Sequence, residues 1–481
     1  MRILISMVIL ILVDFILFFV SFYFGIALNS FYMQKDINVF LPSSEYLERE
    51  IIHFILVFLC ILWFGGGQLR HYSYRKPFWF ELKEIIKIIF IFSIFELAII
   101  AFSKLYFSRY LWITIWGITL FFVPLGRFFI KKLLINLKLY TKNTIIIGAK
   151  KNALDAYKAL ISEPYLGLVI TQFISVDNST IEDEIKNLDI NIIRSKDVDK
   201  FLDLNNNIDT QFIIALEENE DVLRNFWLRK LTRKNYRFIS IVPTVRGIPL
   251  YSTDVAFIFS YEIMLLRIHN NLSKISSRFL KRIIDIIGSL LLLILFSPLL
   301  ITLYYLISRE EGGRWGNVIY GHTRIGRNKK PFKCLKFRSM VLNSQEVLQQ
   351  ILANDPVARR EWEKDFKLKN DPRITKVGHF LRKTSLDELP QLLNVLKGEM
   401  SLVGPRPIVR SELIKYKDNV DYYFMAKPGM TGLWQISGRN NVDYTTRVYY
   451  DVWYVKNWSI WNDIVILFKT VKIVLNRNGA Y

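Results

Sequence analysis

Four long apolar stretches lie in the first 135 residues and constrain the fold more than any other feature. They span residues 3–25, 51–66, 85–102 and 110–130. Each approaches the roughly 17–25 residues that a helix needs to cross a bilayer, although the second is the shortest. A buried helical core could imitate one such stretch, but not four with basic loops between them. The pattern predicts a domain of four transmembrane helices over residues 1–135.

The basic residues around these stretches predict how the domain is oriented. They lie between the second and third stretches and after the fourth: Arg70, Arg75, Lys76, Lys83, Arg127, Lys131, Lys132 and Lys138. Because loops rich in Lys and Arg stay in the cytoplasm, both ends of the four-helix domain are expected to face the cytoplasm.

The composition agrees with a membrane protein and limits its partners. Apolar residues make up 52% of the chain and the mean hydropathy is +0.23, which is high for a soluble protein. The formal net charge of +21 favours nucleic acid, anionic lipid or phosphorylated substrates as partners. The 36 Phe and 24 Tyr lie in apolar runs and are not interleaved with basic stripes. We therefore expect lipid and phosphate as partners, and no nucleic acid.

Residues 136–255 alternate short apolar runs with helical patterns. The stretch NTIIIGAKKNALDAYKAL, from residue 143, is typical of a strand, a turn and a helix. Such alternation predicts a Rossmann-like parallel α/β module. The phosphate-binding pattern G-x-G-x-x-G is reduced to Gly148, so we expect a degenerate nucleotide site with a structural or regulatory role. Asp197 and Asp199 form a D-x-D triplet, which we interpret as a solvated loop because lysines surround it.

A fifth apolar run follows a predicted linker at residues 256–275. Its residues 286–307 are long enough to cross a bilayer, but Ser297 and Pro298 interrupt them and both flanks are basic. A crossing would place the rest of the chain outside, against the charge rule. We therefore predict a re-entrant membrane helix over about 279–308, which dips into one leaflet and returns. A simple fifth crossing is the alternative.

Two neighbouring features are expected at the membrane surface. Lys281 and Arg282 precede the apolar run and are expected at the level of the lipid head groups, with Asp285 paired to one of them. Residues 457–475 are aromatic at their start and amphipathic afterwards, which is typical of an interfacial helix.

Two adjacent carboxylates, Asp387 and Glu388, precede an apolar, helix-like run. Ser385 and Glu388 have the spacing of a capping box. With Asp387 as the N-cap instead, Pro390 falls at the third helical position, where its missing N–H costs little. Either arrangement places the carboxylates at the N-terminus of a helix. Alone, such a pair is nearly always a cap, so the surrounding residues must decide.

The pair is surrounded by long motifs. They are KFRSM at 336–340, NDPR at 370–373, TSLDELPQLLNVLKGEMSLVGPRP at 384–407, KPGMTGLWQISGRN at 427–440 and YYDVWYVKNWSIWNDI at 449–464. With them, residues 276–481 resemble the polyprenyl-phosphate hexose-1-phosphate transferases, a family of bacterial sugar transferases that initiate surface glycan assembly. The preceding helices and α/β module make the whole chain similar to the long members, and residues 252–272 are similar to the galactose subgroup.

The resemblance implies a reaction, a fold and a location. The reaction would move a hexose-1-phosphate from a UDP-hexose to undecaprenyl phosphate and release UMP, with galactose favoured and glucose as the chief alternative. The fold would be a multidomain α/β membrane protein in the bacterial inner membrane, with a monotopic catalytic α/β domain at 276–481 on the cytoplasmic face. The implied partners are membrane lipid, downstream glycosyltransferases that build O-antigen, capsule or exopolysaccharide, and a second copy in a homodimer.

The resemblance also implies roles for individual residues. Asp387 would be the nucleophile that forms an aspartyl-phosphosugar, and Glu388 would bind Mg²⁺. Five further residues are expected to bind phosphate, nucleotide or metal: Lys336, Arg338, Arg406, Arg439 and Asp451.

Two other classes of protein are also compatible with parts of the chain. An ordinary glycosyltransferase would transfer the sugar without its phosphate and release UDP. A non-catalytic scaffold of glycan assembly would release no nucleotide, and it would have no need of the Asp387–Glu388 motif.

Overall fold

The computed structural model describes most of the chain. The described residues are 2–34, 41–66, 69–176, 181–194, 202, 210–244, 253–258, 263–268, 271–310, 318–355, 359, 368, 371–438 and 442–475. They form two compact units, Met1–Val245 and Arg246–Tyr481. The first contains a helical bundle and an α/β module, and the second contains the long motifs.

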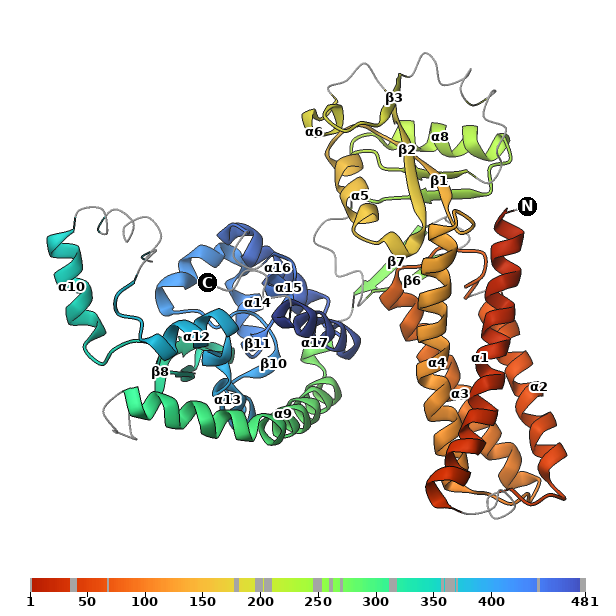
Figure 1. The fold of residues 1–481 in the computed structure, drawn as a ribbon. Helices are drawn as coiled ribbons and strands as arrows, with labels where there is room; N and C mark the ends of the chain where they lie inside the picture. The colour runs from red at the N-terminus through yellow and green to blue at the C-terminus, as the bar shows by residue number, and fades with distance from the viewer. Residues whose placement is uncertain are drawn as a thin grey trace. The chain divides into compact units, whose positions relative to one another are not determined.

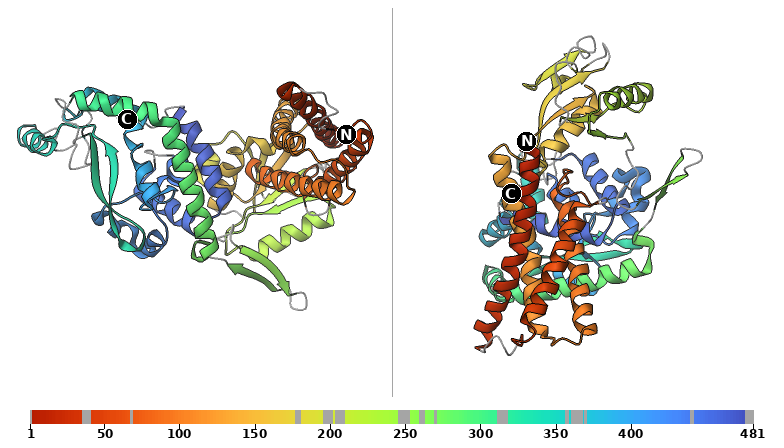
Figure 2. Two further views of the ribbon diagram at one scale, coloured as in Figure 1. Left: turned by 90° about the horizontal axis from the view of Figure 1, so that it is seen from below. Right: turned by 90° about the vertical axis from the view of Figure 1, so that its right-hand side faces the viewer.

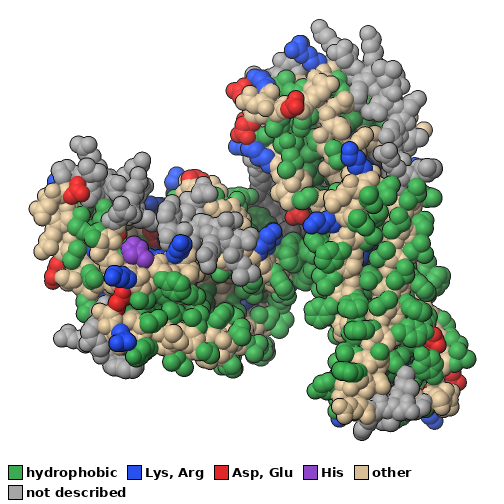
Figure 3. Space-filling view, viewed as in Figure 1, with side chains coloured by type: hydrophobic (Ala, Val, Ile, Leu, Met, Phe, Trp, Pro, Cys, Tyr) green, Lys and Arg blue, Asp and Glu red, His purple; other side chains and the backbone are tan. Residues whose placement is uncertain are grey.

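Four helices form the bundle of the first unit. They are α1 (Arg2–Met33), α2 (Tyr46–Gly65), α3 (Phe78–Phe102) and α4 (Arg109–Asn136), and they run side by side (Figure 1). Hydrophobic side chains also cover the outer surface of the bundle, as expected for contact with lipid (Figure 3). Helices α1, α3 and α4 are long and apolar enough to cross a membrane. In α2 the charged residues Glu48, Arg49 and Glu50 shorten the apolar part. All four predicted helices are present, and three of them, α1, α3 and α4, could cross a membrane by length and composition.

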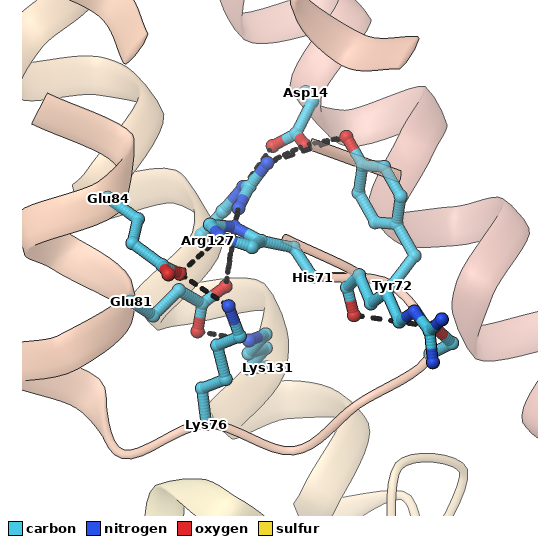
Figure 4. A network of polar contacts seen from close by, with 10 residues as sticks. Asp14, His71, Tyr72, Lys76, Glu81, Glu84, Arg127 and Lys131 are labelled. Atoms are coloured by element: carbon cyan, nitrogen blue, oxygen red, sulfur yellow. Dashed lines mark hydrogen bonds and ion pairs between the residues drawn. The ribbon is translucent and has the colours of Figure 1, made fainter. Parts of the chain in front are cut away.

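Buried charges join three helices near one end of this bundle. The guanidinium of Arg127 in α4 donates to Oδ1 and Oδ2 of Asp14 in α1 at 2.7 and 2.5 Å, and to Oε1 of Glu81 in α3 at 3.2 Å (Figure 4). Lys131 donates to the other Glu81 oxygen at 2.5 Å, and the Tyr72 hydroxyl donates to Asp14 at 2.6 Å. Because an unpaired charge inside a bundle is costly, these bonds fix how α1, α3 and α4 pack.

The α/β module contains a parallel sheet with the strand order β3-β2-β1-β4-β5. The strands are β1 (Lys142–Ile147), β2 (Leu168–Ser175), β3 (Asn191–Arg194), β4 (Gln211–Ile214) and β5 (Phe238–Ile241). Helices α5 (Lys151–Ile161) and α6 (Asp183–Lys186) pack on one face and α8 (Asp221–Arg233) on the other. This strand order and the helices on both faces are those of a doubly wound sheet, which confirms the predicted Rossmann-like fold.

The place where a dinucleotide phosphate would bind is filled by the protein's own carboxylates. Gly148 has φ +128°, and a Cβ there would lie 2.4 Å from the carbonyl oxygen of Ala215. The main-chain N–H of Asn152, in the first turn of α5, donates to Oε1 of Glu217 at 2.8 Å. Such N–H groups bind phosphate in nucleotide-binding relatives of this fold. Because Glu217 accepts the hydrogen bond of this N–H, the contact favours the interpretation of a degenerate nucleotide site. The D-x-D triplet lies outside the described residues.

The second unit begins with an antiparallel hairpin, β6 (Thr253–Ile258) and β7 (Ile263–Ile268). This hairpin crosses the boundary predicted at residue 255 and occupies part of the predicted linker. The helix α9 (Ile275–Glu310) follows it.

The rest of the second unit is mostly helical. Its strands are β8 (Ile319–Ile325), β9 (Pro331–Phe337), β10 (Ser401–Val403) and β11 (Gly429–Thr431), paired as β8–β9 and β10–β11. Its helices are α10 (Ser344–Asn354), α12 (Lys376–Thr384), α13 (Gln391–Lys397), α14 (Val420–Met425), α15 (Leu433–Ile436), α16 (Tyr444–Lys456) and α17 (Ile460–Leu475). A shared core of α13, β10, α16 and α17 side chains packs against α9 and holds these short elements together.

Helix α9 is continuous over 36 residues, with Pro298 inside it. It bends between two straighter segments (Figure 2). The predicted break is therefore a bend within one helix, as expected where proline removes a hydrogen bond. The outward side chains Phe279 and Leu291 are 67% and 62% exposed, which suits contact with lipid. Re-entry into one leaflet and a full crossing both fit this length and composition.

The polar residues at the start of α9 turn into the domain. Lys281 is buried, and its Nζ donates to Oδ2 of Asp463 in α17 at 2.7 Å. Asp285 accepts hydrogen bonds from Ser401 Oγ at 2.9 Å and from the main-chain N–H of Leu402 at 3.0 Å. The predicted pairing of Asp285 with a neighbouring cation of its own helix is therefore wrong. β10 packs against this turn and supplies the partners instead.

Candidate active site

Asp387 and Glu388 lie in a short 3₁₀ turn, η9 (Leu386–Glu388), between α12 and α13. Ser385 has φ +58°, so the chain turns tightly before the pair, and α13 begins only at Gln391 with Pro390 as its N-cap. At these described positions no side chain caps η9 or α13. Both capping arrangements considered from the sequence are therefore wrong, and the carboxylates are available for other contacts.

Lys336, near the end of β9, contacts both carboxylates. Its Nζ lies 2.7 Å from Oε1 of Glu388 and 3.5 Å from Oδ2 of Asp387. The side chain of Glu388 is 36% exposed, whereas that of Asp387 is 14% exposed. One carboxylate is thus enclosed and the other is open, and they share one cation. β9 and η9 bring together three residues that the sequence predicted as parts of one site.

The charges of this trio are strongly coupled. Burial raises the pKa of Asp387, Lys336 acts against this rise, and the charge of Glu388 adds to it. Burial acts to lower the pKa of Lys336, but the charges of Glu388 and Asp387 outweigh burial and raise it. Lys336 is therefore a cation at neutral pH.

The donor set fits a magnesium ion that is held mainly by substrate. Within the described ranges, no cluster of three or more His, Cys, Asp or Glu is arranged to bind a metal. Mg²⁺ commonly needs only one or two protein carboxylates, because waters and substrate phosphates complete its shell. The exposed carboxylate of Glu388 and the nearby Asp387 provide such a pair.

Two further basic residues, Arg382 and Arg338, lie on the segments that carry the trio. Arg382 of α12 donates through Nε to Ser339 Oγ at 3.0 Å, and its charge acts to lower the pKa of Asp387. Arg382 was not among the predicted site residues, although it stands five positions before Asp387 in the same motif region. The guanidinium of Arg338 lies 5.6 Å from the ring centre of Tyr320, on the strand paired with β9.

Arg406 follows β10, and its main-chain N–H donates a hydrogen bond to Asp451. Asp451 is buried and accepts hydrogen bonds from the Tyr416 hydroxyl at 2.7 Å and from the Arg406 main-chain N–H. Burial raises the pKa of Asp451 to about 7, against these hydrogen bonds and the charge of Arg406. These contacts make Asp451 a positioning residue for the Arg406 loop. Its contact with metal or nucleotide stays a prediction.

The guanidinium of Arg406 lies 5.5 Å from the ring centre of Trp434. Arg447, which was not among the predicted site residues, lies 5.3 Å from the same ring. Arg439, predicted to meet the nucleotide, lies outside the described residues.

An apolar groove of about 650 Å³ begins beside the carboxylates. Its lining comes from α9, β8, β9 and the start of α13: Leu293, Leu300, Ile301, Thr302, Tyr304, Tyr305, Ile319, Phe337, Leu389, Pro390 and Leu393. Phe337 follows Lys336 in the chain and Leu389 follows Glu388, so the groove and the charged trio are built from the same two segments. Ser297 and Pro298 lie on α9 between the groove residues Leu293 and Leu300.

Comparison with known proteins agrees with this geometry. Residues 276–477 match the family described as bacterial sugar transferase. An uncharacterized sugar transferase of Haemophilus influenzae is 58% identical over 480 residues, which covers 100% of both chains. The undecaprenyl-phosphate galactose phosphotransferase of Salmonella typhimurium is 56% identical, and the UDP-galactose-lipid carrier transferase of Erwinia amylovora is 52% identical. Each of these two alignments spans 469 residues and covers 97% of this chain and 96% of the relative. Identity of this extent shows that the protein belongs to the bacterial sugar transferase family, as the motifs around Asp387 predicted.

Proposed function

We propose that the protein transfers galactose-1-phosphate from UDP-galactose to undecaprenyl phosphate and releases UMP, as a step in polysaccharide synthesis. The observation that carries this proposal is the trio of Asp387, Glu388 and Lys336, together with the apolar groove that their chain neighbours Phe337 and Leu389 help to line. The choice of galactose rests on the names of the Salmonella and Erwinia relatives. Glucose is the alternative sugar.

The reaction would proceed in two displacements at one phosphorus. In the first, a carboxylate oxygen of Asp387 attacks the phosphorus that bears the sugar, the bond to the bridging oxygen breaks, and UMP leaves. In the second, a phosphate oxygen of undecaprenyl phosphate attacks the same phosphorus and releases the Asp387 carboxylate. The product is a lipid diphosphate sugar.

The remaining residues would stabilise the negative charge that accumulates. Glu388, together with substrate oxygens, would hold Mg²⁺, which supplies positive charge to the diphosphate when bound. The charge of Lys336 acts to lower the pKa of Asp387, which favours the ionised nucleophile, and Lys336 would also approach the transferred phosphate. Arg406 and Arg338 would bind the outer phosphate oxygens, since guanidinium suits bidentate phosphate contacts.

The groove beside the trio would take the first isoprene units of the lipid. Its lining is almost wholly apolar, and α9 supplies more than half of it. We place the protein in the bacterial inner membrane with the catalytic domain on the cytoplasmic face, where UDP-sugars are made. A re-entrant α9 would keep the carboxylates at the membrane surface, where the phosphate of the lipid lies.

Nucleotide release by the full chain in membrane nanodiscs tests the proposal. The protein receives undecaprenyl phosphate, Mg²⁺ and either UDP-galactose or UDP-glucose. We expect UMP from UDP-galactose, none with Asp387→Asn, and unchanged release with Asp421→Asn, an exposed carboxylate that serves as a matched control. Release of UDP would identify an ordinary glycosyltransferase. Absence of nucleotide from either sugar would favour a scaffold.

A further inference from the structure

A small basic pocket lies at the first turns of α9, apart from the site described above. Its polar lining comes from three segments that are far apart in the sequence. These side chains are Arg278, Lys281, Arg282 and Asp285 of α9, Arg327 of η8 (Arg327–Lys329), and Lys427, which follows α14. Five cations thus converge with one carboxylate.

The protein neutralises only part of this charge. Lys281 is paired with Asp463, and Asp285 is used by β10. Arg282 donates to the carbonyl oxygens of Val395 and Leu396 at 2.5 and 2.6 Å, which are dipoles and not charges. In the described part of the chain, no ion pair is formed by the other three cations, Arg278, Arg327 and Lys427.

One donor in the pocket is buried without a partner. Nε of Arg327 is inaccessible to solvent and makes no hydrogen bond to any described residue. An unsatisfied buried donor destabilises the fold, and it does so more strongly when it is charged. The Lys427 ammonium and the Arg282 guanidinium both approach Gly398, each 3.3 Å from where a Cβ would lie. Burial lowers the pKa of Lys427, and the charges of Arg282 and Arg327 act in the same direction. An anion would relieve both the missing bond and the repulsion.

The pocket is separated from the active site by the length of α13. Arg282 binds the last carbonyls of α13, whereas Asp387 and Glu388 precede its first turn. Helix α13 has seven residues, which corresponds to about 10 Å. A phosphate in the basic pocket would therefore not reach the nucleophile.

The position of the pocket on α9 indicates the kind of anion. Phe279 and Leu280, in the same turn as Arg278, Lys281 and Arg282, are exposed, and the apolar outer face of α9 continues from there. A lipid has a phosphate for the cations and acyl chains for this apolar face, whereas a free phosphate satisfies only the cations. We propose that the pocket binds the phosphate head group of an anionic phospholipid of the surrounding leaflet and so anchors the first half of α9.

The test measures lipid binding by the full chain and does not depend on the sugar or on turnover. Purified protein in zwitterionic detergent is titrated with short-chain phosphatidylglycerol, phosphatidylcholine or inorganic phosphate, and the thermal unfolding midpoint is followed. We expect a saturable rise with phosphatidylglycerol alone. In the variant Arg278→Gln with Lys427→Gln, the binding should weaken roughly 30-fold, since each surface cation contributes about 1 kcal/mol to the attraction.

A matched variant removes two exposed cations elsewhere in the same domain, Lys376→Gln with Arg410→Gln, and should bind like the original chain. Mass spectrometry of lipid retained after extraction from phosphatidylethanolamine–phosphatidylglycerol vesicles gives a second measurement if the pocket variant unfolds early. Equal binding by the two double variants would overturn the proposal. An equal rise with inorganic phosphate would overturn the lipid assignment. Displacement of phosphatidylglycerol by one equivalent of undecaprenyl phosphate would instead make the pocket part of the substrate site.

Discussion

The start of α5 in the α/β module and the η9 turn in the catalytic domain are both places where a phosphate could bind, but their own residues occupy them differently. In the module, the N–H of Asn152 is bound by Glu217, and Lys150 is paired with Glu220 at 2.6 Å. At η9, two carboxylates share the single cation Lys336. At the start of α5 the protein's own carboxylates bind these donors, so no ligand is needed there. At η9 the carboxylates share one cation, and Glu388 is partly exposed, so oxygen atoms are available for a ligand.

The same contrast separates the two clusters of buried charge. Around Arg127, every cation has a carboxylate partner, and the result is a fixed helix packing. In the pocket at the start of α9, cations outnumber carboxylates and one donor has no partner in the described structure. Paired charges fix how segments pack, whereas an excess of unpaired positive charge makes a pocket a candidate site for an anion.

Removal of divalent cations should have the largest effect. We expect a chelator to reduce UMP release by roughly 10³-fold or more, because Glu388 and substrate oxygens would hold the ion that neutralises the diphosphate. Added Mg²⁺ should restore the rate, with the dependence shifted to higher concentration in Glu388→Gln. The exposed control Glu346→Gln should keep the original dependence. Full activity in the chelator would contradict the metal assignment.

The second-largest effect on UMP release is expected when Lys336, the cation shared by the two carboxylates, is removed. We expect Lys336→Gln to lower the rate of UMP release roughly 10²- to 10³-fold, since it removes positive charge from the reacting phosphate and from Asp387. Lys150→Gln makes the same change in the module and should leave the rate within about twofold. If both variants lose activity equally, the two sites do not differ in the way their contacts suggest.

Asp451 should make the stability of the catalytic domain depend on pH. Its pKa is raised to about 7, whereas an unfolded aspartate titrates near 4, so the folded state retains a proton that the unfolded state loses. The stabilisation is complete below about pH 4 and is lost as the pH rises through 7, by about 4 kcal/mol. Thermal unfolding between pH 5 and 8 should show this slope, and Asp451→Asn should flatten it. An unchanged slope would exclude Asp451 as its cause.

The smallest effect is expected at the module. Glu217→Gln should weaken the bond to Asn152 and cost about 1 kcal/mol, because a charge-assisted hydrogen bond becomes a neutral one. Hydrogen exchange should become faster at the start of α5, with no change in UMP release. Strong protection of that turn by added nucleotide in the variant would show that the carboxylate had been blocking a working site.

The elements that sequence patterns predicted well are those whose signal is local. Apolar runs of membrane length predicted α1 to α4, and the strand–turn–helix pattern at residue 143 predicted the parallel sheet. The boundary of α13 was predicted wrongly, because capping patterns do not register the left-handed turn at Ser385 that delays the helix start. The predicted partner of Asp285 was wrong because β10 lies more than a hundred residues further along the chain.

The sequence by itself determined the membrane helices, the α/β module and the motif residues Asp387, Glu388, Lys336 and Arg406, since these depend on hydropathy and on residues close together in the chain. Only the tertiary structure decided which charges are satisfied. Arg127 meets Asp14 across 113 positions, and Lys281 meets Asp463 across 182. A sequence pattern gives each of these residues its charge, but packing between distant segments decides whether that charge has a partner. For this protein, that difference separates structural residues from binding sites.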